Sequence, residues 1–495
     1  MRRSRSENEK LSSILNLCSR ERPDKTFLFE LKRNLAISFR EFEGLVGAAC
    51  RLFRSLGLKK GDTVSAFLDN NAEFCVLYFA SLFYGTVFNP FPYFLIAPEI
   101  KRDLDALKPK IIFIQEERRA EFGILKDEPA VYFVRAGPER GFLAELGSHP
   151  GGLLEDDVDP GAPACLYHTS APESEPRGVL YSRRNIMALI PSVARGLKLG
   201  DEDVHLIVLP LGHTAALNYS LLPAALRGGS VVLADNFWNI RKDFWNLVTG
   251  RGITYAEVVP TILFILLHLP GGPQAPPVLK YLGCGSAPLS LKLQAEFEAG
   301  FGLPVANLYG LTETGPTHFD DPFSPGWKRG RIGRPLDINR VAVFDAEGNE
   351  LPDGRTGEIA VQGDNVFPGY AINGEMTGRH FVKGFFRTGD LGARDGDGVF
   401  EFQGLKKRLI IRGGINVHPG EIDGVLASHP GVLEAWTEGT PDDFFGELIR
   451  SYVVLREGWT VPESQLKAFC AERLSPIKIP DFIVQTRDMA GVRRA

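Results

Sequence analysis

Cysteine is scarce in this sequence, and the few cysteines lie far apart. The 495 residues contain six of them: Cys18, Cys50, Cys75, Cys165, Cys284 and Cys470. No two form a Cys-x-x-Cys pair, which is the spacing typical of zinc sites and redox motifs, and the scattered pattern favours reduced thiols over disulfides. We therefore expect a cytoplasmic protein without a zinc site.

Long apolar runs are also missing. The first ten residues include basic side chains, but no apolar run follows them, so we expect no secretory signal. The most apolar segment, residues 74–97, is interrupted by Gly85, Pro90 and Pro92. These breaks predict a buried helix followed by a strand, and they argue against a membrane span.

Neither sign of charge dominates the chain. The sequence carries 56 basic and 61 acidic residues, which gives a net charge of −5, and the basic residues form no block. A nucleic-acid partner is therefore not indicated, because such partners select a basic patch or stripe.

The composition that remains is that of an ordinary globular protein, with 44% hydrophobic and 24% charged residues. A chain of 495 residues is too long for one core, so two or more domains are expected. Helical spacing over residues 42–56 alternates with short apolar strands, which predicts an α/β domain with largely parallel sheets. The composition changes near Gly404, and we predict a large domain over residues 1–403 and a small α+β domain over residues 404–495.

Residues 307–316 (NLYGLTETGP) concentrate groups that suit a nucleotide. Tyr309 offers a ring that can stack on a flat base, Thr312 offers a hydroxyl for a phosphate oxygen, and Glu313 offers a carboxylate for Mg²⁺. A polar turn between a strand and a helix is the alternative interpretation of the same stretch.

This stretch resembles the adenine- and Mg²⁺-binding motif of the adenylate-forming superfamily, which includes acyl-CoA synthetases, adenylation domains of peptide synthetases and luciferases. The resemblance covers nearly the whole chain. It implies a large N-terminal domain of stacked mixed sheets with helices, followed by a small mobile α+β lid domain. It also implies a two-step reaction. A small-molecule carboxylic acid attacks the α-phosphate of ATP, and the lid then rotates so that coenzyme A, or the phosphopantetheine thiol of an acyl carrier protein, takes the acyl group.

The resemblance assigns roles residue by residue. It implies that Tyr309 stacks on adenine, Thr312 contacts phosphate and Glu313 holds Mg²⁺. Asp390, in residues 388–390 (TGD), matches the aspartate that binds both ribose hydroxyls, a role that suits a carboxylate. A solvated acidic residue in a turn is the alternative for Asp390.

Two further segments match loops around the acyl group. Residues 283–288 (GCGSAP) resemble the loop that walls the adenine and acyl pocket, which implies roles for Gly285, Ser286 and Ala287. A tight strand-to-helix turn is the alternative, and the incomplete G-x-G-x-x-G pattern argues against a dinucleotide site. His213 resembles the histidine beside the acyl carboxylate, although a structural histidine fits the position equally well.

The small domain carries one matching segment. Residues 413–421 (GGINVHPGE) resemble the lid loop that lines the thiol tunnel after rotation. The glycines of this segment suit a close approach of the backbone to another surface.

The phosphate loop departs from the family pattern T-S-G-T-T-G-x-P-K-G, because here it reads TSAPESEPRG. Thr169, Ser170 and Arg177 remain as expected phosphate contacts, with Arg177 in place of the usual lysine. Pro172 removes an N–H donor, and Glu173 adds a negative charge where the triphosphate is expected. A surface loop without a ligand is the alternative interpretation.

Two other positions depart as well. Leu405 stands where the family has an arginine that contacts the ribose. Val492 follows Gly491 where the family has its adenylation lysine, and the last lysine of the chain is Lys478. Arginine is a poor replacement for the point charge of a lysine, so neighbouring arginines would restore little.

Three hypotheses follow from these matches and departures. The first is an ordinary AMP-forming ligase that activates an acyl or aryl acid and then forms a thioester with a thiol or an amide with an amine. The second is an enzyme of the same fold that has lost the ATP half-reaction and transfers an acyl group from a preformed adenylate or thioester. The third is a non-catalytic acyl- or nucleotide-binding partner. Apolar residues around 217–225 and 258–267 predict an apolar acyl or aryl pocket, and the acid itself stays open.

Overall fold

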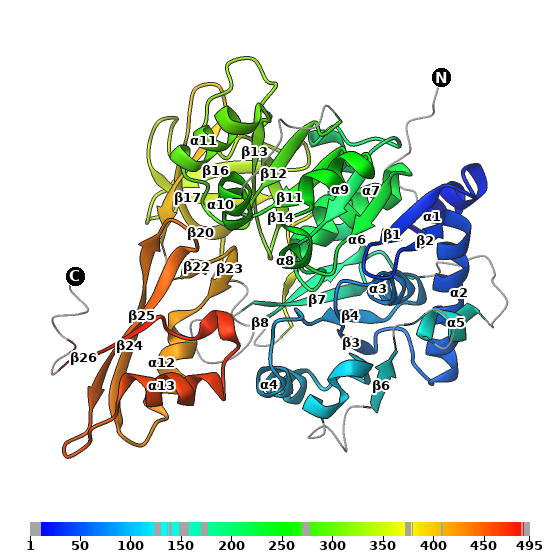
Figure 1. Ribbon diagram of the computed structural model, residues 1–495. Helices are drawn as coiled ribbons and strands as arrows, with labels where there is room; N and C mark the ends of the chain where they lie inside the picture. Colours follow the sequence, from blue (N-terminus) through cyan, green and yellow to red (C-terminus); the bar gives the residue numbers. More distant parts are fainter. Residues whose placement is uncertain are drawn as a thin grey trace.

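The computed structural model consists of a large body and a small C-terminal unit (Figure 1). It describes residues 11–122, 130–135, 137, 141–147, 158–169, 177–269, 278–371, 378, 380–406, 409–486 and 489. The large body contains three sheets with helices, and the small unit contains one sheet with helices on it. This arrangement is the stacked mixed α/β fold that the sequence predicts.

The largest sheet has parallel strands at its centre and antiparallel strands at its edges. Among the described residues its strand order is β15 (Arg334–Pro335), β14 (Gly315–Phe319), β13 (Val305–Leu311), β12 (Tyr281–Cys284), β11 (Tyr255–Val258), β9 (Val204–Ile207), β10 (Ser230–Leu233), β1 (Thr26–Glu30) and β2 (Leu35–Ser38). Because parallel strands end at the same edge of a sheet, the loops after β9, β11 and β12 gather there.

The second sheet is built in the same mixed way. Its strand order among the described residues is β18 (Gly369–Tyr370), β8 (Arg177–Ser182), β7 (Pro163–Thr169), β4 (Val87–Pro90), β3 (Thr63–Phe67), β5 (Ile111–Gln115) and β6 (Ala130–Val134). The strands β7 and β8 form a hairpin whose last described pair is Thr169 and Arg177.

Four helices connect these two sheets: α2 (Phe39–Ser55), α3 (Ala72–Tyr84), α6 (Arg183–Gly196) and α7 (Leu222–Arg227). The helix α3 contacts β4 and β7 of the second sheet and packs on α2, which in turn contacts β1 and β2 of the largest sheet. Almost every residue of α3 is buried, as expected of a helix that is apolar on all sides. Ser38 and Asn71 cap the N-termini of α2 and α3, and Gly85 ends α3 in a left-handed conformation.

The other helices lie around these layers. They are α1 (Leu11–Glu21), α4 (Ala97–Leu107), a 3₁₀ turn (Glu116–Phe122), α5 (Phe142–Gly147), α8 (Phe237–Ile240), α9 (Phe244–Gly250), α10 (Pro260–His268) and α11 (Leu291–Phe301). A short π-helical turn, η2 (Ala216–Leu221), precedes α7 and packs against β9, β11 and β14. Such turns occur frequently at functional sites.

The third sheet leads to the small unit. Its strands are β16 (Arg340–Phe344), β17 (Gly357–Gln362), β20 (Phe385–Arg394) and β19 (Phe381–Val382), and β21 (Phe400–Leu405) pairs with β20. The chain then enters the small unit, whose elements are β22 (Ile410–Arg412), β23 (Ile415–Val417), α12 (Pro419–Ala427), β24 (Val432–Asp442), β25 (Gly446–Leu455), α13 (Glu463–Ala471), a 3₁₀ turn (Pro476–Lys478) and β26 (Phe482–Gln485).

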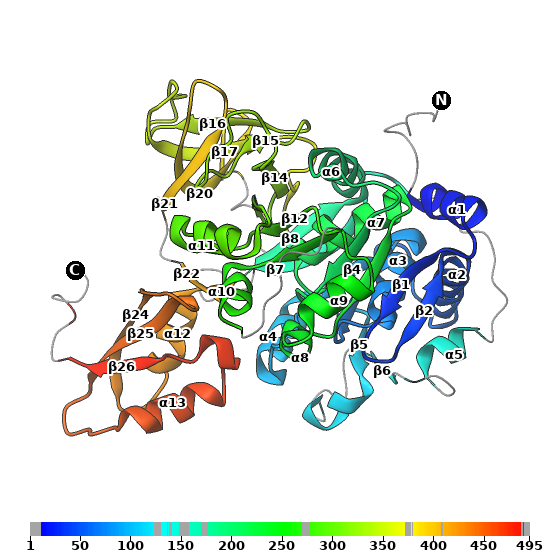
Figure 2. The ribbon, with the colours of Figure 1, turned by 45° about the horizontal axis from the view of Figure 1, so that its top comes forward.

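The small unit lies at one side of the large body (Figure 2). It has a hydrophobic core of its own, formed by buried residues between Ile410 and Ile483. A separate core supports the predicted small domain. The boundary after residue 403 stays a prediction.

Four charged side chains join the small unit to the large body; we call them the interdomain ionic cluster: Glu99, Arg102, Glu421 and Lys478. Lys478 Nζ lies 2.6 Å from Glu99 Oε1 on α4 and 3.0 Å from Glu421 Oε2 on α12. Arg102 Nη1 lies 3.1 Å from Glu421 Oε1. Glu99 and Lys478 are buried, so the cluster pairs charges that would be costly to bury alone.

Most of the expected elements are present, and one differs from expectation. Residues 307–316 form the β13–β14 hairpin, so the strand-to-helix turn considered for them is wrong. Among the described residues, no helix is long and apolar enough to cross a membrane. Cys75, Cys165, Cys284 and Cys470 are buried.

The interdomain ionic cluster predicts the effect of removing its central cation. Lys478→Met leaves the buried Glu99 carboxylate without its cation and Glu421 with Arg102 alone, and we expect it to lower the free energy of unfolding by about 3–5 kcal/mol. Lys101→Met on the same α4 breaks an exposed pair with Asp105 and should cost under about 1 kcal/mol. Urea denaturation measures both, and equal small losses would contradict this account of the cluster.

Candidate active site

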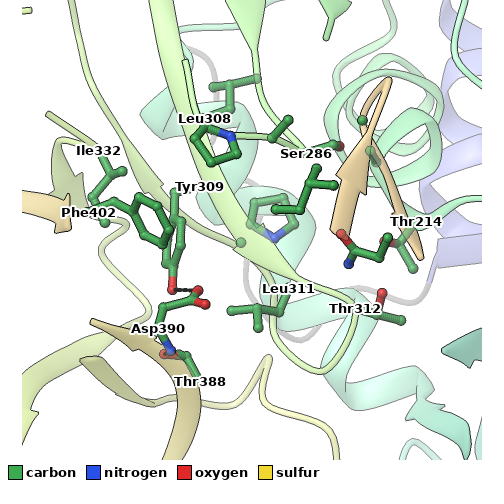
Figure 3. A pocket seen from close by; sticks show the side chains of 18 of the residues that line it. Thr214, Ser286, Leu308, Tyr309, Leu311, Thr312, Ile332, Thr388, Asp390 and Phe402 are labelled. Atoms are coloured by element: carbon green, nitrogen blue, oxygen red, sulfur yellow. Dashed lines mark hydrogen bonds between the residues drawn. The ribbon is translucent and has the colours of Figure 1, made fainter. Parts of the chain in front are cut away.

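A cavity of about 260 Å³ lies where the largest sheet, the third sheet and the small unit meet (Figure 3). Its wall includes seven residues that the sequence singled out: His213, Ser286, Ala287, Tyr309, Thr312, Glu313 and Asp390. They come from four separate parts of the chain. The fold therefore brings together the residues that the resemblance predicts to act together.

A hydrogen bond between Tyr309 and Asp390 forms one end of the cavity (Figure 3). Tyr309 Oη donates to Asp390 Oδ2 at 2.6 Å, which joins β13 of the largest sheet to β20 of the third sheet. Burial, and then the charge of Asp390, raises the pKa of Tyr309 well above its ordinary value, so the phenol keeps its proton. Asp390 is held in place by its own N–H, which donates to Thr388 Oγ1. Asp390 is thus buried and structured, unlike a solvated turn residue.

Glu313 and Thr312 lie at the tip of the β13–β14 hairpin. Tyr370 Oη donates to Glu313 Oε1 at 3.0 Å, and the Glu313 carbonyl accepts from Phe367 N–H at 2.9 Å. These contacts orient the Glu313 carboxylate at the wall of the cavity. Tyr370 could not be identified from the sequence, because its partner Glu313 lies 57 residues away.

A metal at this point would need ligands beyond the protein. Among the described residues, no group of three or more His, Cys, Asp or Glu side chains is arranged to hold a metal ion. A single carboxylate beside an anionic substrate fits Mg²⁺, which is usually bound by one or two carboxylates together with phosphate oxygens and water. Glu313 therefore fits a metal that arrives with a phosphate-bearing substrate.

His213 begins the segment that leads into η2. The Ala215 N–H donates to His213 Nδ1 at 3.3 Å, so Nδ1 acts as the acceptor and the proton of the neutral ring is assigned to Nε2. Burial lowers the pKa of His213 from 6.5 to about 4. His213 is therefore a neutral hydrogen-bond donor at the cavity, not a cation.

The turn after β12 forms another wall. Ser286 has a left-handed backbone with φ of +64°, and it leads from β12 toward α11. A Cβ at Gly285 would lie 2.8 Å from the Leu308 carbonyl oxygen, so only glycine fits there. Gly285 supports the wall from behind, and Ser286 and Ala287 line it.

The small unit closes the cavity with its lid loop, residues 413–418. Gly414, Asn416 and His418 all line the cavity. Gly414 has φ of +81°, and a Cβ at this position would lie 2.5 Å from Val259 Cγ1 of the large body. The lid backbone thus approaches the large body as closely as the glycines allow. Leu405, the residue at the predicted arginine position, also lines the cavity.

The predicted phosphate loop is only partly described. Ser170 and the side chains of Thr169 and Arg177 lie outside the described residues. The backbones of Thr169 and Arg177 pair at the base of the β7–β8 hairpin, as a loop between two strands requires. The phosphate contacts of all three residues stay predictions.

The low pKa of His213 can be measured directly. We expect the His213 Cε1–H resonance, identified by its loss in His213→Gln, to keep its chemical shift from pH 7.5 down to about pH 5. Because the folded-state pKa lies below the unfolded-state value, His213 stabilises the fold above about pH 6.5, and this contribution disappears as the pH falls toward 4. The same residue in urea should titrate near 6.5. A midpoint near 6.5 in the folded protein would contradict the account.

Known proteins resemble the chain over almost its whole length. The family model for AMP-binding enzymes matches residues 17–371, and the model for their C-terminal domain matches residues 421–492. A sulfoacetate–CoA ligase from Cupriavidus necator is 35% identical over 475 residues, which are 95% of this chain and 92% of the relative.

Two solved structures resemble the fold. An o-succinylbenzoate CoA synthetase from Bacillus subtilis, bound to a product analogue, OSB-NCoA, gives a TM-score of 0.84 at 25% identity and covers 96% of this chain and 94% of that one. ATP-bound MatB from Rhodopseudomonas palustris gives 0.73 at 27% identity, with 96% and 95% covered. The family models span both parts of the chain, and the chain belongs to the AMP-binding enzyme family of the adenylate-forming superfamily.

Proposed function

We propose that this protein is an acid-activating ligase of the AMP-forming type. It joins a carboxylic acid to ATP as an acyl-adenylate, releases pyrophosphate, and passes the acyl group to the thiol of coenzyme A. The observation that carries this proposal is the single cavity shared by Tyr309, Asp390, Thr312, Glu313, His213 and the lid loop. The similarity to a sulfoacetate–CoA ligase over 95% of the chain supports the same reaction class.

The end of the cavity formed by Tyr309 and Asp390 binds the adenosine. The Tyr309 ring stacks on the base, and the Asp390 carboxylate accepts hydrogen bonds from the ribose hydroxyls. The hydrogen bond between the two side chains holds both in place before the substrate binds. Binding therefore loses little side-chain conformational entropy. Ser286 and Ala287 form the facing wall.

The tip of the β13–β14 hairpin reduces the repulsion between the carboxylate and the phosphates in the first half-reaction. The acid's carboxylate oxygen attacks the α-phosphorus, and pyrophosphate leaves with the bonding electron pair, so two anions must approach each other. Thr312 donates its hydroxyl to a phosphate oxygen, and Glu313, oriented by Tyr370, would hold a Mg²⁺ that arrives with the nucleotide and that would neutralise phosphate charge when bound.

His213 positions the acid. Its ring is neutral and the proton is assigned to Nε2, so it donates a hydrogen bond to the acid's carboxylate without adding a charge. A hydrogen bond from a neutral donor orients a carboxylate and leaves it nucleophilic, whereas a full ion pair would reduce its reactivity. Orientation of this kind is a large part of catalysis in bimolecular reactions.

The lid loop serves the second half-reaction, in which a thiol attacks the acyl carbon and AMP leaves. Asn416 and His418 reach the cavity beside the adenosine end, where a thiol has to enter. This placement supports a role of the lid loop in accepting the thiol. Coenzyme A is the proposed acceptor, and an acyl carrier protein is the alternative.

The second candidate is a transferase that no longer uses ATP. It is favoured by Leu405, which lines the cavity where the family has a ribose-binding arginine, and by the proline and glutamate in the expected phosphate loop. It would take the acyl group from a preformed adenylate or thioester. The buried thiols support placing either enzyme in the cytoplasm, and biosynthesis is the proposed setting.

The two half-reactions can be measured separately. We expect acid-dependent exchange of labelled pyrophosphate into ATP for at least one member of a panel of carboxylic acids, and thioester formation when coenzyme A is added. Gly414→Val should keep the exchange and lower thioester formation by about 100-fold, because the added side chain collides with Val259 only in the present lid orientation.

A matched control is available on the same lid. Gly458→Val introduces the same side chain at the same φ of +81° but where a Cβ meets no atom within 4 Å, and it should change neither half-reaction appreciably. Absence of exchange for every acid would rule out the ligase. Acyl transfer from a supplied adenylate or thioester would then establish the transferase, and its absence would leave a binding partner.

A further inference from the structure

Glu257 is a buried carboxyl group that has no part in the proposed mechanism. It lies on β11, its side chain is 3% exposed, and neither carboxyl oxygen has a hydrogen-bond partner among the described residues. Buried polar groups nearly always have partners, because leaving one unsatisfied is costly. An unsatisfied carboxyl in the middle of a sheet therefore calls for a ligand or another specific role.

The register of the sheet places Glu257 next to the cavity. Glu257 pairs with Gly283 on β12, and a Cβ at Gly283 would lie 2.6 Å from Leu308 Cδ1 and 3.0 Å from Tyr255 Oη. Side chains alternate along a strand, so Tyr255 and Glu257 share one face of β11. Leu308 and Tyr219 both line the cavity, and Tyr219 belongs to η2, which packs against β11. Glu257 thus lies directly behind the cavity wall.

Two tyrosines accompany Glu257, and we call the three residues the buried acid cluster: Tyr219, Tyr255 and Glu257. Tyr255 Oη is also buried without a partner among the described residues. Burial, and then the nearby Glu257, raises the pKa of both tyrosines well above the ordinary value. Burial alone raises the pKa of Glu257, and no arginine or lysine contributes to that shift.

The absence of a nearby cation limits what this part of the pocket accepts. A second carboxylate or a sulfonate on the acyl group would be a buried anion with no positive charge nearby, so it would be poorly bound. A methyl group would leave the Glu257 oxygens unsatisfied. A hydroxyl or an amino group would donate to them, and a protonated amino group would also supply the positive charge with which Glu257 can ionise and form an ion pair.

We propose that the acyl pocket ends at the buried acid cluster, and that Glu257 selects carboxylic acids whose far end carries a hydrogen-bond donor. The donor is a hydroxyl or an amino group, not a methyl group or a second anion. An acyl chain that leaves His213 and follows Leu308 and Tyr219 brings its far end to Glu257. This inference rests on the proposed function and adds the substrate class to it.

Binding of stable adenylate analogues tests the inference without requiring catalysis. The probes are acyl-sulfamoyladenosines prepared at several chain lengths, each ending in a methyl, hydroxyl, amino or carboxylate group, and calorimetry gives their dissociation constants. At the best chain length, we expect the hydroxyl and amino probes to bind the full-length protein at least about 10-fold more tightly than the methyl probe. The carboxylate probe should bind most weakly.

Two variants assign the preference to Glu257. Glu257→Gln keeps the size and the hydrogen-bonding carbonyl, so it should retain the preference for hydroxyl and lose the preference for amino. Glu257→Leu should reverse the order and favour methyl. Since each preference is a ratio of affinities measured on one folded variant, a change in overall stability does not mimic it.

Several results would overturn the inference. They are a preference of the unaltered protein for methyl or carboxylate, equal binding or no binding of all four probes, or an unchanged ratio in Glu257→Leu. Failure of the proposed function looks different: pyrophosphate exchange would be absent for every acid while the pattern of probe affinities stands. Exchange with a preference for methyl-ended acids would reject only the role of Glu257.

Discussion

The hydrogen bond from Tyr309 to Asp390 fixes the geometry on which the rest of the site depends. It joins two strands of different sheets, 81 residues apart in the sequence, at a distance of 2.6 Å. Beyond Tyr309, the same hairpin carries Thr312 and Glu313 to the middle of the cavity. Asp390 pairs with Leu405, the last residue before the chain turns toward the lid. One contact thus sets the proposed adenosine site, the proposed phosphate site and the start of the lid relative to one another.

Some buried ionisable side chains in this protein have partners and stabilise the fold, whereas Glu257 lies beside the candidate active site. Glu99 and Lys478 are buried as a pair, Lys478 also pairs with Glu421, and these contacts join the small unit to the large body. Glu257 is buried as deeply and has no partner among the described residues, and it lies behind the acyl wall. A paired charge is explained by structure alone, whereas an unpaired one points to a missing ligand.

The sequence predicted the α/β fold and most of the cavity wall because those residues lie in short local motifs. Tyr309, Thr312 and Glu313 fall within five consecutive residues, and their order alone carries the signal. The hydrogen-bond partners of these residues could not be predicted, because they lie far away in the sequence. Tyr370 orients Glu313 from 57 positions away, and nothing in its own neighbourhood marks it.

Two further features depend on tertiary contacts and could not be predicted from the local sequence: the conformation of residues 307–316 and the surroundings of Glu257. The polar stretch around Gly315 looked equally suited to a turn before a helix, but the strand β14 pairs with β13 and makes it a hairpin. Glu257 stands in a short apolar strand and reads as an ordinary interruption of it. Its proposed role depends on Tyr219 of η2 and on Tyr255, which lies on the same face of β11. The roles of Ser170 and Arg177 stay predictions for the reason that their side chains lie outside the described residues.

The central claim is that the acid is activated as an adenylate at the Tyr309–Asp390 end of the cavity. If it holds, one carboxylate oxygen of the acid is transferred to AMP. When the carboxylate oxygen attacks the α-phosphorus and a thiol later displaces AMP, that oxygen stays on AMP. The most direct test supplies an acid labelled with ¹⁸O in its carboxylate, together with ATP and coenzyme A, and measures the mass of the AMP formed. The account predicts AMP that carries one labelled oxygen. Thioester formed with unlabelled AMP, or with no consumption of ATP, would contradict it.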